Sequence, residues 1–166
     1  MAVTTAATFC ATLVDEGVRA GVTDAGVAPG SRSTPLAFAL ADAEAVRVHV
    51  VHDERSASFT ALGLGLASGR PAVVLCTSGT AATHLHGAVV EAHLSAVPML
   101  VCTADRQPEL WDVGAPHTIE QTQIYGSAVR CFCETCVPAD ASRSSWRSVA
   151  SLGVAEAVGW SGLPGP

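Results

Sequence analysis

Four ionisable residues follow directly after an apolar run of the sequence. The run covers residues 46–51, and His52-Asp53-Glu54-Arg55 comes next, ahead of small residues with helical spacing. In an α/β protein this order places Glu54 at the carboxyl end of a strand and at the start of a helix, where open sheets bind ligands. A carboxylate there lies at the favourable end of the helix dipole. Glu54 is therefore a candidate general acid or base, or a group that orients a cofactor, although a solvated first-turn acid would show the same pattern.

Three further polar clusters follow predicted strands in the same way. They are Ser31–Arg32, Thr77-Ser78-Gly79-Thr80 and Asp105–Arg106, after the runs 22–28, 72–76 and 98–102. The carboxyl ends of parallel strands lie on one edge of a sheet, so we expect the four clusters to converge there on a small molecule. The second cluster resembles a phosphate cradle but lacks the lysine of a P-loop.

The converging groups suit an anion with more than one carboxylate. Ser31 and Arg32 precede a predicted helix, so hydroxyl, guanidinium and backbone amide donors meet at its amino end. Arg106 adds a second positive charge at the same edge. The alternative is that each arginine only pairs with Asp53 or Asp105.

The elements that must position these groups alternate along the chain. Strands are predicted over 22–28, 46–51, 72–76, 98–102 and 128–137. Helices are predicted over 4–19, 36–43, 59–66, 85–92, 120–125 and 144–158, and the third of them is expected to bury Phe59, Leu62 and Leu66. Strands that alternate with helices through short loops predict an α/β fold, with a doubly wound parallel sheet flanked by helices.

The cysteines and histidines do not form a recognisable metal site. Cys131 and Cys133 would share one face of the predicted last strand, whereas Cys136 would point to the other. No second Cys or His pair stands nearby at a zinc-site spacing, so we predict no metal and reduced thiols. His84 and His86 are two positions apart and cannot share a helical face. We therefore expect the histidines to be structural.

The composition favours a domain that covers part of its surface with another domain or chain. Of the 166 residues, 49% are hydrophobic and 14% are charged. The net charge of −6, without a basic cluster, argues against nucleic acid or an anionic membrane as a partner. The amino terminus lacks the basic start of a signal peptide, and the longest uncharged run, 71–90, is too polar for a membrane span. We expect one cytoplasmic domain.

Five blocks of the sequence together resemble one enzyme family. The blocks are Pro29-Gly30-Ser31-Arg32-Ser33-Thr34-Pro35-Leu36, His52-Asp53-Glu54-Arg55-Ser56-Ala57, Thr77-Ser78-Gly79-Thr80-Ala81-Ala82, Ala88-Val89-Val90-Glu91-Ala92 and Thr103-Ala104-Asp105-Arg106. They occur in this order over nearly the whole chain. Together they resemble the amino-terminal pyrimidine-binding domain of the 2-succinyl-5-enolpyruvyl-6-hydroxy-3-cyclohexene-1-carboxylate synthases. These are thiamine-diphosphate enzymes of menaquinone biosynthesis.

The resemblance implies a role for each group at the sheet edge. Glu54 would hydrogen-bond a ring nitrogen of the cofactor's aminopyrimidine and favour the imino tautomer, which removes the thiazolium C2 proton. The family decarboxylates 2-oxoglutarate and adds the resulting succinyl-semialdehyde carbanion to isochorismate. Pro29, Thr77 and Gly79 would join Glu54 in binding the cofactor. The residues near the substrates would be Ser31, Arg32, Arg106 and His117.

The sequence departs from the family pattern around the substrate. Pro116-His117 stands where the family has Asn-Gln after Gly-Ala, and His84 and Gly87 stand where it has Asn and Pro. We expect these departures to affect how the substrate is handled and to leave the fold unchanged.

The resemblance also implies that the chain holds half of a cofactor site. The Gly-Asp-Gly motif that begins the magnesium and diphosphate site of such enzymes does not occur. We therefore expect binding of the pyrimidine end only, with Mg²⁺ bound elsewhere in the full-length enzyme. The expected partner is the diphosphate-binding domain of the same enzyme, from a second subunit of a homo-oligomer. Residues 1–158 would form the pyrimidine-binding domain and 159–166 would begin a linker to a middle domain, so the chain alone is expected to be inactive.

Two other functions stay open at this point. A domain of another carboligase, such as a relative of the acetohydroxy-acid synthases, would carry the same glutamate. It is not expected to carry the anion-binding set of Ser31, Arg32 and Arg106. A non-catalytic module for dimerisation or metabolite binding would need none of these groups.

Overall fold

The computed structural model describes residues 4–135, 137–159 and 164–166. Its strands are β1 (Asp24–Val27), β2 (Arg47–Val50), β3 (Ala72–Cys76) and β4 (Met99–Thr103). Its α-helices are α1 (Thr5–Arg19), α2 (Thr34–Asp42), α3 (Glu54–Ser68), α4 (Thr80–Thr83), α5 (His86–Leu94) and α6 (Trp146–Ala157). Three 3₁₀ segments are η1 (Pro108–Leu110), η2 (Gly126–Ala128) and η3 (Asp140–Ser145). Among the described residues, no helix has the length and apolar character to cross a membrane.

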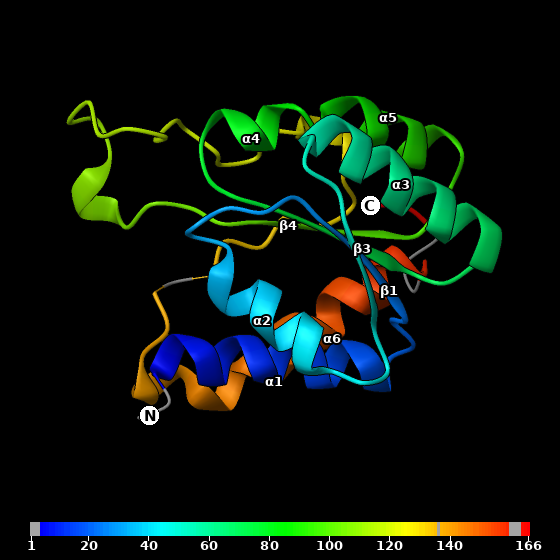
Figure 1. Ribbon diagram of the computed structural model, residues 1–166, viewed down its shortest axis with the longest axis horizontal. Helices are drawn as coiled ribbons and strands as arrows, with labels where there is room; N and C mark the ends of the chain where they lie inside the picture. Colours follow the sequence, from blue (N-terminus) through cyan, green and yellow to red (C-terminus); the bar gives the residue numbers. More distant parts are fainter. Residues whose placement is uncertain (1–3, 136, 160–163) are drawn as a thin grey trace.

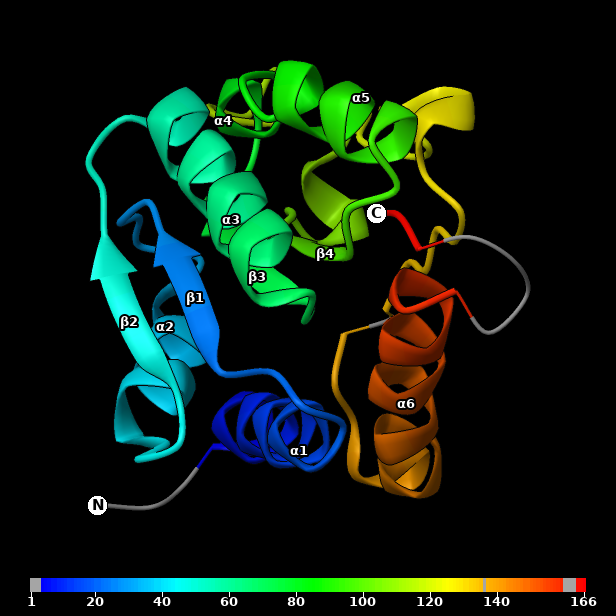
Figure 2. The same ribbon diagram turned by 90° about the vertical axis from the view of Figure 1, so that its right-hand side faces the viewer.

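The four strands form one parallel sheet in the order β2-β1-β3-β4. Strand β1 pairs with β2 from Asp24 opposite Arg47, and β3 pairs with β4 from Ala72 opposite Met99. Helices α1, α2 and α6 lie on one side of the sheet, and α3, α4 and α5 lie on the other (Figures 1 and 2). The chain starts at a central strand and extends the sheet in both directions, which confirms the predicted doubly wound α/β fold.

Helix α3 packs on the sheet through small side chains. Ala57 and Leu62 face inward and are 0% and 8% exposed. A Cβ atom at Gly26 of β1 would lie 3.0 Å from the carbonyl oxygen of Ala57, so helix and strand are in close contact. The predicted buried face is wrong for Phe59 and Leu66, which are 45% and 67% exposed. The helix lies too close to the sheet for such long side chains, and they face outward instead.

The other side of the sheet is closed by a second apolar cluster under α1, α2 and α6. Its buried members are Val14, Val22, Ala25, Val27, Leu40, Val46, Val73, Leu75 and Val154. Helices α1 and α6 are joined at their exposed sides by an edge-to-face contact of Phe9 with Trp146, with ring centroids 5.4 Å apart. Nη1 of Arg147 also donates to the carboxylates of Asp15 and Glu16. Both faces of the sheet are therefore covered, as a parallel sheet requires.

The strand predicted over 128–137 and the short helix predicted over 120–125 are both wrong. Residues 122–125 form turns that lead into η2, and residues 129–135 belong to no strand. A strand needs a neighbour that pairs with its backbone groups. Within the described ranges, no segment pairs with residues 129–135 as a strand.

The cysteines in the described ranges are free thiols of differing exposure. Cys76 is buried, Cys131 is half-buried and Cys133 is exposed. Because residues 129–135 form no strand, the predicted shared face of Cys131 and Cys133 is not formed, and Cys136 lies outside the described residues. The residues whose positions are described include no group of three or more metal-ligating side chains.

Asp24 is a buried carboxylate that ties β1 to the edge strand β2. Its side chain is 5% exposed and accepts hydrogen bonds from Nε and Nη2 of Arg47, both at 3.0 Å. Nε2 of His49 also lies 3.0 Å from this carboxylate. The hydrogen bonds from Arg47 lower the pKa of Asp24 to about 2, although burial opposes them.

The substitution Asp24→Asn should make stability less dependent on pH. The folded pKa of Asp24 is below its ordinary value, so the ionised carboxylate stabilises the fold above about pH 4, and this contribution is lost as the pH falls towards about 2. We expect Asp24→Asn to lower the free energy of unfolding by about 1–2 kcal/mol at neutral pH. Urea unfolding should show a difference that shrinks below about pH 4. Asp42→Asn, at the exposed end of α2, is the control, and a pH-independent difference would contradict the ionic role.

Gly65 and Gly63 form a matched pair on α3 that tests its close packing. A Cβ atom at Gly65 would lie 2.7 Å from the carbonyl oxygen of Pro98 and 2.9 Å from Cγ1 of Val97, whereas one at Gly63 meets nothing within 4 Å. Gly65→Ala should destabilise the fold by about 1–3 kcal/mol through overpacking. Gly63→Ala should stabilise it by about 0.5–1 kcal/mol through helix propensity. Urea unfolding measures both, and equal effects would show that α3 is not held this closely.

Candidate functional site

The four predicted polar clusters follow the carboxyl ends of β1, β2, β3 and β4, as expected. Because the strands are parallel, these ends lie on the same edge of the sheet, where the connecting loops meet (Figure 1). The loops after β1 and β3 touch, since a Cβ atom at Gly30 would clash with the side chain of Thr77. Pro29 lies beside this contact and is exposed. The edge is therefore built from loops in mutual contact.

Glu54 is the first residue of α3. The helix begins here because the Asp53 carboxylate caps it, with Oδ1 accepting from the backbone N–H and the hydroxyl of Ser56, both at 2.8 Å. These hydrogen bonds lower the pKa of Asp53. The Glu54 carboxylate is half-buried, and among the described residues no side chain pairs with it. Burial, and after it the charge of Glu54, raise the pKa of Cys76 to about 12, which places Glu54 near the carboxyl end of β3.

The loop after β3 packs against the backbone of His117. Gly79 has a left-handed φ of 79°, and a Cβ atom there would lie 2.8 Å from the carbonyl carbon and oxygen of His117. The Ser78 hydroxyl donates to the same carbonyl oxygen at 3.0 Å. Glycine is therefore required at position 79 for its φ and for the space. His117 is itself exposed, so the predicted contact of its side chain with substrate stays a prediction.

Gln121 ties the loops after β3 and β4 together. Its Oε1 accepts from the backbone N–H of Gly79 at 2.7 Å, and its Nε2 donates to the carbonyl of Ala104 at 3.1 Å. Gln121 is 6% exposed, so both backbone groups depend on it for a partner. The sequence analysis missed this residue because its partners are backbone groups 42 and 17 positions away, and neither motif nor spacing marks it.

Arg106 is held by the loop that follows it. Its Nη2 donates to the carbonyl of Pro116 at 2.5 Å, and its own carbonyl accepts from Nε1 of Trp111 at 2.9 Å. Its Nε is buried without a hydrogen-bond partner. Burial, and after it the charge of Glu120, raise the pKa of the neighbouring Asp105. One donor of Arg106 is therefore available at this edge for an acceptor from a ligand.

Ser31 and Arg32 are exposed just ahead of α2. The next residue, Ser33, is buried, and its hydroxyl donates to the carbonyl of Gly30 at 2.9 Å, which shapes the turn. Within the described ranges, neither Arg32 nor Arg106 is ion-paired with Asp53 or Asp105. The alternative in which the arginines serve only to pair with these acids therefore has no support. The two arginines follow adjacent sheet positions but make no described contact with each other.

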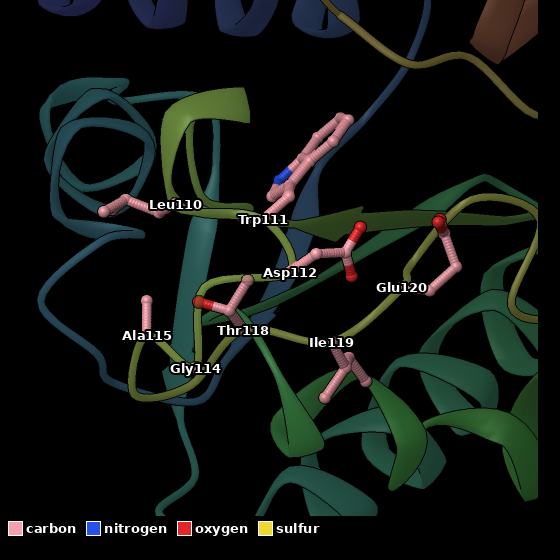
Figure 3. A pocket seen from close by; sticks show the side chains of 8 residues that line it. All are labelled: Leu110, Trp111, Asp112, Gly114, Ala115, Thr118, Ile119 and Glu120. Carbon is pink, nitrogen blue, oxygen red and sulfur yellow. The ribbon is translucent and has the colours of Figure 1, made fainter.

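A small cavity of about 130 Å³ lies within the loop after β4 and away from Glu54. Figure 3 shows its lining, which comes from one stretch of the chain: Leu110, Trp111, Asp112, Gly114, Ala115, Thr118, Ile119 and Glu120. None of the predicted site residues lines it. The predicted site is thus an open edge of the sheet, and this cavity belongs to the neighbouring loop.

The fold and this edge define a class of protein. A parallel α/β domain with an unpaired carboxylate at a helix start and glycine-containing loops beside it is suited to hold a cofactor at the carboxyl edge. Residues 4–124 match the family described as "Thiamine pyrophosphate enzyme, N-terminal TPP binding domain". The chain belongs to this family, and the resemblance seen in its five sequence blocks is confirmed.

Curated relatives that share one name lead to a particular enzyme. The relatives from Thermobifida fusca, Bacillus velezensis and Listeria innocua are 52%, 47% and 46% identical over 93%, 90% and 89% of this chain. Each is named 2-succinyl-5-enolpyruvyl-6-hydroxy-3-cyclohexene-1-carboxylate synthase. The matched part makes up 28% of the first relative and 26% of the other two, so the chain spans about a quarter of their length.

The substitution Gln121→Leu should loosen the edge without removing any group that is expected to touch a ligand. It leaves the N–H of Gly79 and the carbonyl of Ala104 without partners, so we expect a loss of about 1–3 kcal/mol in unfolding free energy. Hydrogen exchange of the Gly79 amide should become faster. Gln107→Leu, at an exposed position without a side-chain hydrogen bond, is the matched control. Unchanged exchange at Gly79 would show that Gln121 does not hold this loop.

Proposed function

We propose that this chain is the pyrimidine-binding domain of a 2-succinyl-5-enolpyruvyl-6-hydroxy-3-cyclohexene-1-carboxylate synthase. The identity of 46–52% to three relatives of that name carries the proposal. The position of Glu54 supports it, because the carboxylate lies at the edge where the fold binds ligands and has no protein partner among the described residues. The relatives are much longer, so the activity, the substrates and the partners are part of the proposal.

The residues at the carboxyl edge fit the pyrimidine end of thiamine diphosphate. A half-buried carboxylate that lacks a protein partner suits a ring nitrogen that carries a proton, and close-packed backbone at Gly30 and Gly79 leaves main chain exposed to a flat ring. Glu54 would hold the ring through this hydrogen bond and exchange a proton with it. Pro29, Thr77 and Gly79 would line the ring. When bound, the cofactor supplies the electron sink for decarboxylation and carbon–carbon bond formation.

The arginines would bind the substrate carboxylates. Both 2-oxoglutarate and isochorismate carry two carboxylates, and Arg32 and Arg106 place two guanidinium groups at this edge. The buried Nε of Arg106 has a donor to spare, and Ser31 adds a hydroxyl beside Arg32. His117 stands in the loop that holds Arg106 through Pro116, so its side chain would reach substrate only from the outer rim.

The rest of the active site would come from outside this chain. We propose that a diphosphate-binding domain of the same enzyme, from a second subunit of a homo-oligomer, holds Mg²⁺ and the diphosphate end of the cofactor. On this proposal the chain binds only the pyrimidine end and is inactive alone. A cytoplasmic location stays a prediction.

A domain replacement tests the proposed function. The matched segment of the Thermobifida fusca relative is replaced by this chain, and consumption of 2-oxoglutarate with isochorismate is measured. We expect turnover, and Glu54→Gln should lower kcat by about 10²–10⁴-fold because the proton transfer at the ring is lost. Glu44→Gln makes the same chemical change at the opposite edge of the sheet and should leave kcat unchanged.

Three outcomes of the replacement would overturn the proposal or one of its parts. A folded chimera that consumes pyruvate and not 2-oxoglutarate would favour a carboligase of the acetohydroxy-acid-synthase type. A chimera that binds thiamine diphosphate but turns over neither substrate would favour a non-catalytic module. If Glu54→Gln retained full kcat, the catalytic assignment of Glu54 would be wrong.

A further inference from the structure

The outer edge of β4 is unpaired among the described residues. Strand β4 hydrogen-bonds only to β3, and just past its end the amide of Ala104 donates to the carbonyl of Cys76 at 3.1 Å. Backbone groups along a strand point alternately to its two sides. Counting back from Ala104, the amides of Leu100 and Cys102 therefore point towards β3. Those of Val101 and Thr103 point away from it.

The two edges of the sheet differ in character. At the β2 edge, Arg47 and His49 carry polar heads and hold the carboxylate of Asp24. Charged side chains of this kind are a common protection for an exposed edge strand. Strand β4 reads Met-Leu-Val-Cys-Thr, without charge or proline, and its Met99 is 1% exposed. The composition of β4 is that of a strand inside a sheet.

A second segment that is suited to pairing lies next to this edge. Residues 129–135 carry the pattern from which the sequence predicts a strand, but they belong to none. Val129 packs against the same apolar cluster as Val101 of β4. Within the described ranges, the backbone hydrogen bond that joins this segment to another runs from the amide of Arg130 to the carbonyl of Pro166, at 2.7 Å.

The last described residues lie beside both unpaired segments. Gly165 and Pro166 are buried, and the amide of Gly165 donates to the carbonyl of Ala157 at the end of α6 at 3.0 Å. Helix α6 also lies against β4, since a Cβ atom at Gly153 would lie 3.7 Å from Cδ2 of Leu100. In Figures 1 and 2 the carboxyl end lies close to β4.

We propose that β4 and residues 129–135 take up one further β-strand between them. The occupant is the polypeptide that follows the matched segment in the longer synthases, so this inference rests on the proposed function. Its backbone would pair with Val101 and Thr103 on one side. On the other side it would continue the pairing that Arg130 and Pro166 begin. Residues 129–135 would then become the strand that the sequence predicts, and the domain boundary would lie beyond the linker predicted at 159–166.

Hydrogen exchange tests this proposal without substrate or cofactor. The chain is compared with a version extended by the segment that follows the matched part of the Thermobifida fusca relative, about 12 residues, which is enough for a strand and its turn. We expect the amides of Val101 and Thr103 to exchange at least about 100-fold more slowly in the extended chain. The amides of Leu100 and Cys102, which already face β3, are the internal control. A third chain, with prolines at alternate positions of the extension, should lose the protection.

Each other result decides against the proposal. Equal exchange of Val101 and Thr103 in the extended and proline-containing chains would contradict it, including where the unextended chain does not hold its fold. Protection that appears in the unextended chain and grows with concentration would assign the edge to a second copy of the chain. The test is also separate from the proposed function, because a protected edge in an inactive chimera would refute the activity and retain the strand.

Discussion

The close contact of α3 with the sheet fixes the geometry of the carboxyl edge. Gly26 under Ala57, and Gly65 against Pro98, let the helix lie on the strands with no intervening large side chain. The Asp53 cap sets the residue at which this helix begins. Glu54 therefore has a position determined by main-chain contacts, and its carboxylate is near the end of β3 without a protein group to neutralise it.

The groups around Glu54 divide into those that are satisfied within the protein and those that are not. Ser78, Gly79 and Gln121 form a hydrogen-bonded frame that joins two loops. The carboxylate of Glu54 and Nε of Arg106 have no partner in the described part of the chain. Such a division is typical of a preorganised site, in which a rigid shell holds a few polar groups for a ligand.

Features that depend on local sequence could be predicted, and features that depend on distant pairing could not. The runs 72–76 and 98–102 gave β3 and β4 nearly residue for residue, because a strand covered on both faces is continuously apolar. The abrupt change from apolar to ionisable residues located Glu54. Gln121 could not be found, because its partners are backbone groups of other loops. Residues 129–135 have the composition of a strand, but a strand also requires a neighbour.

The central claim is that Glu54 holds the pyrimidine ring of thiamine diphosphate at the carboxyl edge of this sheet. A crystal structure of the chimera with the Thermobifida fusca relative, grown with thiamine diphosphate, tests it most directly. The account predicts the Glu54 carboxylate within hydrogen-bond distance of a pyrimidine ring nitrogen, with Gly79 beside the ring. A cofactor bound elsewhere, with Glu54 facing water, would contradict the account.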